Sequence, residues 1–392
     1  MLPESRPPLR ILHLNFHRGW GGQPQRILVE ARELARIGHA VALAVPGDGL
    51  LAERGRAEGI PVYGDVRFRP PARALSFLED ARAIRNAVRE FQPDLVHSHG
   101  SQDTWATLAA NRTAGALRRP HVVTRHNTKR VADSAANRFL YRRIDRLIVV
   151  SESVIEQYAP YVARGILERA EIAVIPSPVD AARFDGAGPA DPTALRTALG
   201  VPAGAPLIGC VGRLVPDKGQ RHLIDAAAVL HQRHPEARYL LVGTGTEEPA
   251  LRAQVARLNL EGIVIFAGFR NDVPAITAAL DISVLPSVDC DASSAVLKEA
   301  MLLGKPVVAT DIGGAREILE PGPSGLVVPP GDARALADAI ARVLEDRALA
   351  GRLSASGPAI ARERYSVARF AADTIAVYRE LLRPAPAAGT KS

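Results

Sequence analysis

Short apolar segments alternate with helical segments along this 392-residue chain, and this alternation constrains the fold more than any other feature. The apolar segments are rich in Val, Ile and Leu, which is typical of buried parallel strands. Those of the first half are 9–15, 40–45, 94–99, 121–124 and 146–150, and those of the second are 206–211, 239–243, 263–267, 282–285 and 307–309. Strands separated by helices indicate βαβ units, so we expect two parallel sheets.

A stretch rich in glycine and proline, residues 181–204, separates the two series and predicts a linker. We therefore expect an α/β protein with two doubly wound, Rossmann-like domains that face a cleft. The first domain is predicted to span residues 1–184 and the second residues 185–366. A last helix is predicted over 367–383, and residues 384–392 are expected to be a disordered tail.

The formal net charge of +7 is concentrated in the first half of the chain. Residues 1–184 hold 27 Lys and Arg against 19 Asp and Glu, a difference of +8, whereas residues 185–392 hold 22 against 23, a difference of −1. Much of the excess lies between Arg112 and Arg146. A basic surface attracts anions such as phospholipid headgroups or phosphorylated glycolipids. An arginine-rich, merely solvated surface is the alternative interpretation.

The sequence favours a cytoplasmic protein. No apolar run approaches the roughly 18 residues that a membrane-spanning helix needs. The first residues lack the basic and then apolar regions of a signal peptide. The two cysteines, Cys210 and Cys290, form no ligand cluster; we expect Cys210 to be a core residue, and no base near Cys290 in sequence suggests a catalytic thiol.

Two carboxylates, Asp291 and Glu299, lie eight positions apart in the segment that leads to Gly304 and a buried strand. We expect a short helix that carries Glu299, with Ser293 and Ser294 as its capping residues. Backbone amides near Ala295 and Val296 would then face a phosphate. Glu299 would accept hydrogen bonds from ribose hydroxyls, as the acidic residue of a dinucleotide site does.

Two cations and two pairs of glycines follow other predicted strands. Arg213 comes directly after a strand and Lys218 precedes a helix predicted over 220–230, so together they could neutralise a diphosphate; an arginine paired with Asp217 is the alternative. Glycines at strand ends let the backbone approach a ligand, although a plain turn is nearly as good an explanation. The glycines in question are Gly21 and Gly22, before a helix predicted over 23–37, and Gly243 and Gly245.

Histidines end two adjacent predicted strands. His97 and His99 are two residues apart, so both imidazoles should lie on one face, and Arg125 and His126 end the next strand. His126 would face the cleft and contact a substrate hydroxyl. A metal pair at His97 and His99 is an alternative, but the sequence indicates no third ligand, so we expect no metal site.

In their order along the chain, these motifs resemble the retaining glycosyltransferases of family 4, which have the GT-B fold. The resemblance covers about Leu9 to Phe370, and the motifs that carry it are Gly21-Gly22, Pro93 to His99, Val150-Ser-Glu152, Ile175 to Asp180, Gly212-Arg213 with Lys218-Gly219, Asp291 with Glu299-Ala-Met, and Gly313-Gly314 to Asp332. It implies transfer of a sugar from a nucleotide diphosphate without a metal or other cofactor, with retention of the anomeric configuration. It also implies that the last helix crosses back to the first domain.

The resemblance assigns roles residue by residue. Arg213 and Lys218 would stabilise the diphosphate, Glu299 would hold the ribose, and Asp291 would hold the donor sugar. Gly21 and Gly22 would close over the diphosphate, and His126 would lie near the reacting carbon. We place His97, His99 and Arg125 on the acceptor side. A front-face attack, assisted by the leaving phosphate, is the preferred mechanism because no carboxylate is clearly placed as a nucleophile.

Two positions depart from the family pattern. Family members usually have Glu followed by Gly-Phe-Gly where this chain has Asp291 followed by Ala-Ser-Ser, so Asp289 is an alternative contact for the sugar. Pro178 stands where an Asn-Gly turn is more usual, and it removes a backbone amide. Two rival functions follow: a nucleotide-sugar 2-epimerase of the same fold, and a non-catalytic nucleotide-sugar-binding relative.

The expected partners are a nucleotide sugar and a glycan or glycolipid acceptor, such as a lipopolysaccharide core or a polysaccharide precursor. The basic first half suggests peripheral contact with an anionic membrane at its inner face. Nucleic acid is not expected, because the basic half has no aromatic platform or recognised motif.

Overall fold

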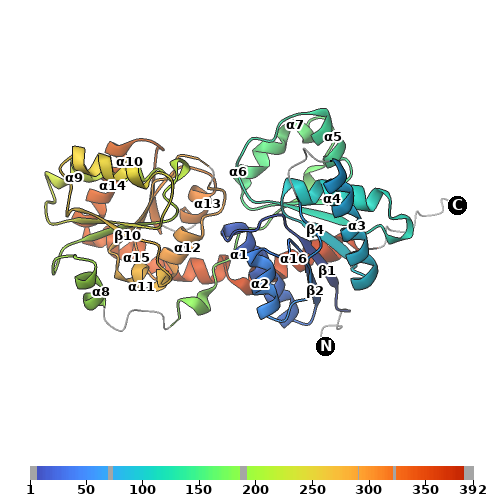
Figure 1. Cartoon of the computed structure of the whole chain (residues 1–392). Helices are drawn as coiled ribbons and strands as arrows, with labels where there is room; N and C mark the ends of the chain where they lie inside the picture. The colour runs from blue at the N-terminus through green and yellow to red at the C-terminus, as the bar shows by residue number, and fades with distance from the viewer. Residues whose placement is uncertain (1–6, 69–73, 186–191, 290, 321–323, 384–392) are drawn as a thin grey trace, which may run out of the picture.

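The computed structural model describes residues 7–68, 74–185, 192–289, 291–320 and 324–383. Two lobes lie side by side, each built around one parallel sheet (Figure 1). Cys290, residues 186–191 of the predicted linker and the predicted tail 384–392 lie outside the described residues. The boundary between residues 184 and 185 therefore stays a prediction.

The first sheet has seven parallel strands in the order β3-β2-β1-β4-β5-β6-β7. Its central strands are buried, since helices cover both faces, and this explains why they read as continuous apolar runs. The strands are β1 Arg10–Leu14, β2 Ala40–Ala44, β3 Val62–Tyr63, β4 Leu95–Ser98, β5 His121–Arg125, β6 Arg146–Val149 and β7 Ile172–Val174.

The helices of the first lobe connect successive strands. Gly38, with a left-handed φ of 97°, follows the end of α1, where glycine commonly ends a helix. The α-helices are α1 Gly22–Arg36, α2 Leu50–Ala57, α3 Ala74–Phe91, α4 Ser101–Arg112, α5 Ala135–Tyr141, α6 Glu152–Ile155 and α7 Ala159–Val162, and the 3₁₀ turns are η1 Gly115–Leu117, η2 Glu156–Tyr158, η3 Arg169–Glu171 and η4 Ala181–Arg183.

The second sheet has six parallel strands in the order β10-β9-β8-β11-β12-β13. Its core, which includes the predicted core residue Cys210, is formed by apolar side chains of β8, β9 and β11 packed against α9 and α14. The strands are β8 Leu207–Val211, β9 Arg238–Val242, β10 Val264–Gly268, β11 Ile282–Leu285, β12 Val307–Thr310 and β13 Gly325–Val328.

Helices of the second lobe run to the end of the described chain. They are α8 Pro192–Ala198, α9 Gln220–His231 after the 3₁₀ turn η5 Pro216–Lys218, α10 Glu248–Arg257, α11 Val273–Ala279, α12 Ala295–Leu302, α13 Ala315–Leu319, α14 Ala333–Glu345, α15 Arg347–Arg364 and α16 Val367–Leu381. None of the helices in the described ranges is long and apolar enough to cross a membrane.

The last helix returns to the first lobe, as the resemblance implied (Figure 1). Phe370 and Tyr378 of α16 are 3% and 0% exposed and belong to the first-lobe core. The Tyr378 hydroxyl donates to Glu30 Oε1 of α1 at 2.8 Å, and the Arg26 guanidinium lies 4.5 Å above the Phe370 ring. The last helix of the chain therefore belongs to the core of the first lobe, although it follows the second lobe in sequence.

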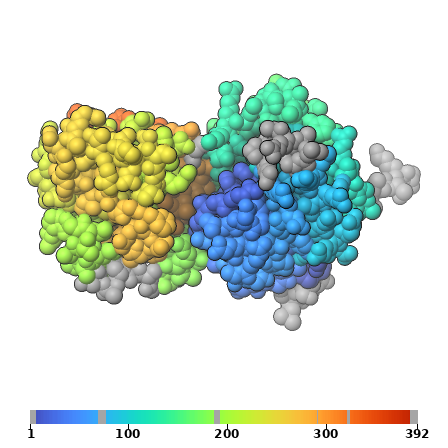
Figure 2. All heavy atoms as spheres, viewed as in Figure 1, coloured from blue at the N-terminus to red at the C-terminus, as the bar shows by residue number. Residues whose placement is uncertain are grey.

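Both sheets reverse their strand order at a central strand. β1 pairs with β2 on one side and β4 on the other, and β8 pairs with β9 and β11. In parallel sheets the loops after such strands separate and leave a crevice at the carboxyl ends. Figure 2 shows the two lobes and the recess between them on one face.

The sequence missed three strands. β3 has only two residues, β7 has three, and β13 contains a glycine, so each lacks the apolar run that marks the others. Each end of the other ten predicted strands lies within one residue of the observed end, which is the usual uncertainty of such boundaries.

Candidate functional site

Helix α12 carries Glu299 and begins at Ala295, as the sequence predicted, after Ser294 as its N-cap residue. Glu299 is half-buried; burial raises the pKa of its carboxyl group, and the charges of Arg183 and Lys298 oppose that rise. The predicted side-chain caps are wrong. The Ser294 hydroxyl makes no capping bond. The Ser293 hydroxyl instead accepts a hydrogen bond from the backbone amide of Ser177 at 3.1 Å.

Lys298, which the sequence did not predict as a site residue, is fully buried beside Glu299. Its ammonium donates to the Ser177 carbonyl and to the Ser293 hydroxyl, each at 2.7 Å, and lies 4.7 Å from the centre of the Tyr365 ring. Burial lowers the pKa of Lys298 to about 7. This lysine therefore ties the start of α12 to the segment that leaves β7.

The structure brings Lys218 and Asp291 together beside the carboxyl end of β8. Lys218 Nζ lies 2.7 Å from Asp291 Oδ2, and the Ser287 hydroxyl donates to the same oxygen at 3.1 Å. Asp291 is 7% exposed, whereas Asp289 is exposed. Arg213 is exposed two residues past the end of β8, so its guanidinium is accessible to a ligand at the same sheet edge.

The predicted glycines divide into two kinds. A Cβ at Gly243 would lie 2.0 Å from the Gly212 carbonyl oxygen, and one at Gly245 would lie 2.1 Å from the Leu214 carbonyl oxygen. The close packing of the loops after β8 and β9 is therefore enough to explain why both positions are glycine, whether or not a ligand binds there. A Cβ at Gly21 or Gly22 would meet nothing within 4 Å, and both are exposed at the start of α1.

Gly313 and Gly314, after β12, hold the Asp291 loop in place. A Cβ at Gly313, whose φ is 58°, would lie 2.1 Å from the Asp291 carbonyl oxygen, and one at Gly314 would lie 2.5 Å from that of Ala292. Only glycine permits this approach. Ala292, in turn, packs into the first-lobe cluster that contains Val150 and Val154.

Four histidines meet in the first lobe, and the structure corrects the acceptor-side prediction for two of them. His97 and His99 are 1% and 2% exposed, and Tyr378 of α16 contacts His97 while His126 contacts His99. His97 is hydrogen-bonded to Tyr378 Oη at 2.6 Å and to Thr124 Oγ1 at 2.7 Å. His99 lies behind His126, with His99 Nδ1 and His126 Nε2 3.0 Å apart.

The prediction that no third ligand accompanies His97 and His99 is wrong. His13 lies opposite His97 in the pairing of β1 with β4, and one ring nitrogen from each of the three lies within 4.8 Å of the others. His13 was visible in the first predicted strand, but only the strand pairing shows that it is a neighbour. The three rings are also hydrogen-bonded partners of neighbouring groups, so proximity alone does not define a metal centre.

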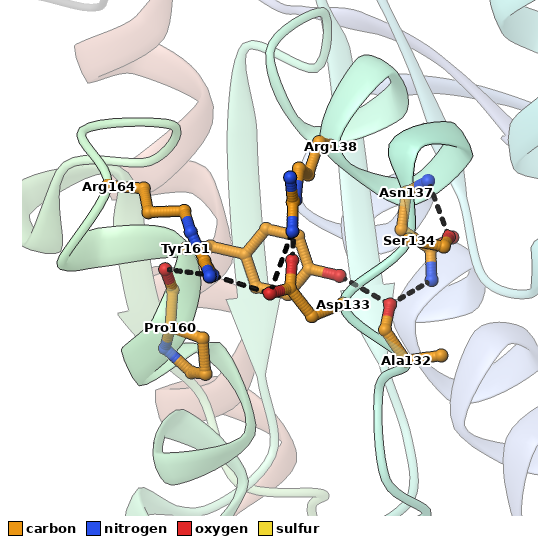
Figure 3. Close-up of polar contacts among 8 residues, drawn as sticks. All are labelled: Ala132, Asp133, Ser134, Asn137, Arg138, Pro160, Tyr161 and Arg164. Atoms are coloured by element: carbon orange, nitrogen blue, oxygen red, sulfur yellow. Dashed lines mark hydrogen bonds and ion pairs between the residues drawn. The ribbon is translucent and has the colours of Figure 1, made fainter.

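The loop that follows His126 is held by the network in Figure 3. Asp133 accepts two hydrogen bonds from Arg138, at 2.7 and 3.0 Å, and one from Arg164 at 2.5 Å. The Tyr161 hydroxyl donates to the Ala132 carbonyl at 2.6 Å. Arg125, predicted on the acceptor side, is half-buried and donates to the Lys129 carbonyl at 2.6 Å, so its guanidinium helps to shape this loop.

A second contact between the lobes lies at α6. The carboxylate of Glu317, on α13, accepts two hydrogen bonds of 2.9 Å: one to Oε2 from the backbone amide of Glu152 and one to Oε1 from that of Ser153. An open cleft of about 850 Å³ lies beside this contact, and the lining residues are Glu152, Ser153, Ile155, Glu156, Ala159, Asp311, Gly313, Arg316, Glu317 and Glu320. None of the predicted site residues lines it.

Two protein families match this chain, one in each lobe. The family described as "Glycosyltransferase Family 4" matches residues 20–183, and "Glycosyl transferases group 1" matches residues 205–346. The chain is 31% identical to the 2-deoxystreptamine N-acetyl-D-glucosaminyltransferase of Streptomyces fradiae over 353 residues. This alignment covers 83% of each protein.

This chain belongs to glycosyltransferase family 4.

Other relatives of this family 4 protein include the lipopolysaccharide core biosynthesis mannosyltransferase LpsB of Rhizobium meliloti, 30% identical over 254 residues, with 63% of this chain and 69% of LpsB covered. Its fold is that of the Anabaena protein Alr3699/HepE in complex with UDP, with a TM-score of 0.80, 27% identity, and coverage of 95% of this chain and 100% of that one. The family 4 protein is thus a GT-B glycosyltransferase that transfers a sugar from a nucleotide-sugar donor.

Because Lys298 is buried, the stability of this glycosyltransferase should depend on pH. The pKa of about 7 lies below the ordinary value of 10.5, so the unfolded chain binds more protons between those pH values. Stability linked to Lys298 therefore rises with pH from about 7 to 10.5, by at most about 1.4 kcal/mol per pH unit for one proton. In urea unfolding, we expect the free energy of unfolding of the wild type to rise relative to that of Lys298→Met as the pH is raised over this range. The exposed Lys129→Met is the control, and a wild-type advantage over Lys298→Met that stays constant with pH would contradict the assignment.

Proposed function

We propose that this glycosyltransferase binds the donor diphosphate at the carboxyl edge of the second sheet, between Arg213, Lys218 and the start of α12. One observation carries the proposal: the loops after β8 and β11 bring Lys218 and Asp291 within 2.7 Å, at the reversal in strand order where such folds bind ligands. The complexes of Alr3699/HepE with UDP and with UDP-glucose support it, because that protein shares the fold.

The donor's other groups would meet the remaining predicted residues. Glu299 would accept the ribose hydroxyls, and the amides of Ala295 and Val296, after Ser294, would face a phosphate oxygen. Gly21 and Gly22 would come close to the diphosphate from the other lobe, since neither is needed for packing. Gly243 and Gly245 would line the same edge through their backbone, while Asp291, or Asp289, would hold the sugar.

The reaction would proceed with retention and without a metal ion. Positive charge from Arg213 and Lys218 would stabilise the diphosphate as it leaves, which is the stabilisation that a metal otherwise supplies. The acceptor hydroxyl would attack from the same face and pass its proton to the leaving phosphate. His126, half-buried at the end of β5, would contact the sugar near the reacting carbon.

Substitution of the donor residues tests the assignment. Arg213→Ala should lower kcat by about 10²–10³, as loss of one transition-state hydrogen-bond donor does elsewhere. Glu299→Ala should mainly raise KM for the donor, since ribose binding is present before and during the reaction. Arg257→Ala is the control, because Arg257 ends α10 at the opposite edge of the sheet.

Steady-state assays with UDP- and GDP-sugars, scored for transfer, hydrolysis and epimerisation, provide the measurement. A near-wild-type kcat/KM for the donor in both Arg213→Ala and Glu299→Ala would refute the assignment. Conversion of the nucleotide sugar without an acceptor would favour the epimerase, and donor binding without any reaction would favour the non-catalytic relative.

Retention and metal independence are tested with one active donor and acceptor pair. Activity should be unchanged after EDTA treatment, and proton NMR of the product should show the same anomeric configuration as the donor. Activity that disappears with EDTA and returns with Mg²⁺ or Mn²⁺ would overturn metal independence, and an inverted product would overturn retention.

We also propose that the basic part of the first lobe contacts an anionic membrane or glycolipid acceptor. Residues 112–146 contain ten Lys and Arg but only Asp133 and Asp145. Asp133 is occupied by Arg138 and Arg164, and Asp145 lies 3.5 Å from Arg118. The exposed cations that remain without a carboxylate partner in the described chain are Arg112, Lys129, Arg130, Arg142 and Arg143.

Vesicle binding measures this contact. The double variant Arg130→Gln/Arg142→Gln should weaken association with phosphatidylserine-containing vesicles by about 2 kcal/mol, or about 30-fold, because each surface cation contributes about 1 kcal/mol. Arg347→Gln/Arg352→Gln removes two exposed arginines from the second lobe and should have no effect. Binding by the wild type that does not weaken as salt is raised would count against an electrostatic contact.

A further inference from the structure

Three imidazoles form a hydrogen-bonded row from the proposed sugar site into the first-lobe core. His126 Nε2 lies 3.0 Å from His99 Nδ1, and His99 Nε2 lies 3.0 Å from His13 Nδ1. At the inner end, His13 Nε2 lies 3.8 Å from Glu30 Oε1. At the outer end His126 is half-buried, and no group of the described residues bonds to its Nδ1, which is not an enclosed atom.

All three imidazoles are held neutral. Burial lowers the pKa of His13 to about 4 and those of His99 and His126 well below the ordinary value, and the charge of Arg26 adds to the effect for His99 and His126. A neutral imidazole has one N–H donor and one acceptor nitrogen. Each ring in the row must therefore donate on one side and accept on the other, so the whole row has only two consistent directions.

In the inward direction, His126 Nε2–H donates to His99, His99 Nε2–H donates to His13, and His13 Nε2–H points at Glu30. In the outward direction all three protons move to Nδ1. The His13 Nε2 lone pair would then face Glu30, and His126 Nδ1–H would face the cleft. The choice between the directions depends on what stands at the inner end.

Glu30 is an ionised carboxylate at that end. Complete burial alone would raise the pKa of Glu30, but the charge of the buried Arg26 guanidinium, one turn earlier on α1, lowers it and makes Glu30 the counter-charge of that arginine. Glu30 Oε1 accepts from the Tyr378 hydroxyl at 2.8 Å, and Oε2 has no hydrogen-bond partner among the described residues. A lone pair on His13 Nε2 would be repelled by this buried negative charge, whereas an N–H there is attracted to it. Glu30 therefore favours the inward direction.

We propose that Glu30, acting through His13 and His99, fixes the tautomer of His126 so that its Nδ1 is a hydrogen-bond acceptor for a sugar hydroxyl. This inference rests on the proposed function, in which His126 contacts the sugar. Glu30, His13 and His99 are positioning residues, because they act through His126 and do not touch the substrate. The aspartate of the serine protease triad controls a histidine tautomer in the same way, and its replacement by Asn lowers kcat about 10⁴-fold.

His97 is a neighbour of this row rather than a member. Its two nitrogens are hydrogen-bonded to Tyr378 and Thr124, not to another imidazole. A metal ion held by His13, His97 and His99 would need the lone pairs that the row uses, so the two arrangements exclude each other. Stoichiometric zinc or another transition metal in the purified protein, measured by mass spectrometry, would overturn the proposal.

The tautomer is measured directly by two-bond ¹H–¹⁵N NMR of the histidine-labelled protein, with the His126 signals assigned by their loss in His126→Ala. We expect His126 Nδ1 to be unprotonated and Nε2 protonated in the wild type. In Glu30→Gln, which keeps the shape but removes the charge, the Nδ1 signal should move toward the protonated range. Glu33→Gln, one turn along α1 and paired with Arg36, should leave it unchanged. A protonated Nδ1 in the wild type would overturn the proposal even if Glu30→Gln fails to fold.

Kinetics supply the second measurement. Glu30→Gln should lower kcat ten- to a hundredfold with KM for the donor within twofold, and Glu33→Gln should match the wild type. A Glu30→Gln protein with wild-type kcat and an unchanged His126 tautomer refutes the proposal. If His126→Ala transfers sugar normally, the proposed role of His126 fails, while the NMR result still decides whether Glu30 sets the tautomer.

Discussion

The reversal of strand order at β1 and at β8 is the constraint on which the site depends. The strands that are neighbours at the reversal are far apart in sequence, and their carboxyl ends lie at the same edge of the sheet. Residues from distant parts of the chain therefore meet there. In the second lobe this joins Lys218 to Asp291, 73 residues apart, at 2.7 Å. In the first it joins His13 of β1 to His99, just past β4, at 3.0 Å. The same topological step thus produces both the ion pair and the histidine row.

The two lobes meet around Ser177, in the segment that leaves β7. Arg26 of α1 donates to the Ser177 hydroxyl at 3.1 Å, and Lys298 of α12 donates to the Ser177 carbonyl at 2.7 Å. Both cations are buried, and a buried cation needs such partners, so removal of the contact would leave charge unpaired. These bonds fix the start of α12 relative to α1.

Much of this arrangement could be predicted from the sequence, because strand periodicity and strand ends are local properties. Glu299 on its helix and Lys218 after β8 lie where the pattern indicated. The burial of His97 was not predictable, since it depends on Tyr378, 281 residues away, in a helix whose partner face the pattern does not reveal. Gly243 and Gly245 were ambiguous for a related reason: a glycine required by an adjacent loop and one open to a ligand look alike in sequence.

The shortened carboxylate Asp291 is better understood from its partners than from its length. Lys218 and Ser287 both donate to Oδ2, so the carboxyl group is fixed and Oδ1 is the oxygen left for a ligand. An ammonium has three N–H groups, and only one is used by Asp291. Lys218 can therefore hold the carboxylate and a phosphate oxygen at once, which would couple recognition of the sugar to stabilisation of its leaving group. In the proposed sugar contact, orientation by these two donors would offset the missing methylene group, because a fixed acceptor loses less conformational entropy on binding than a longer, freer one.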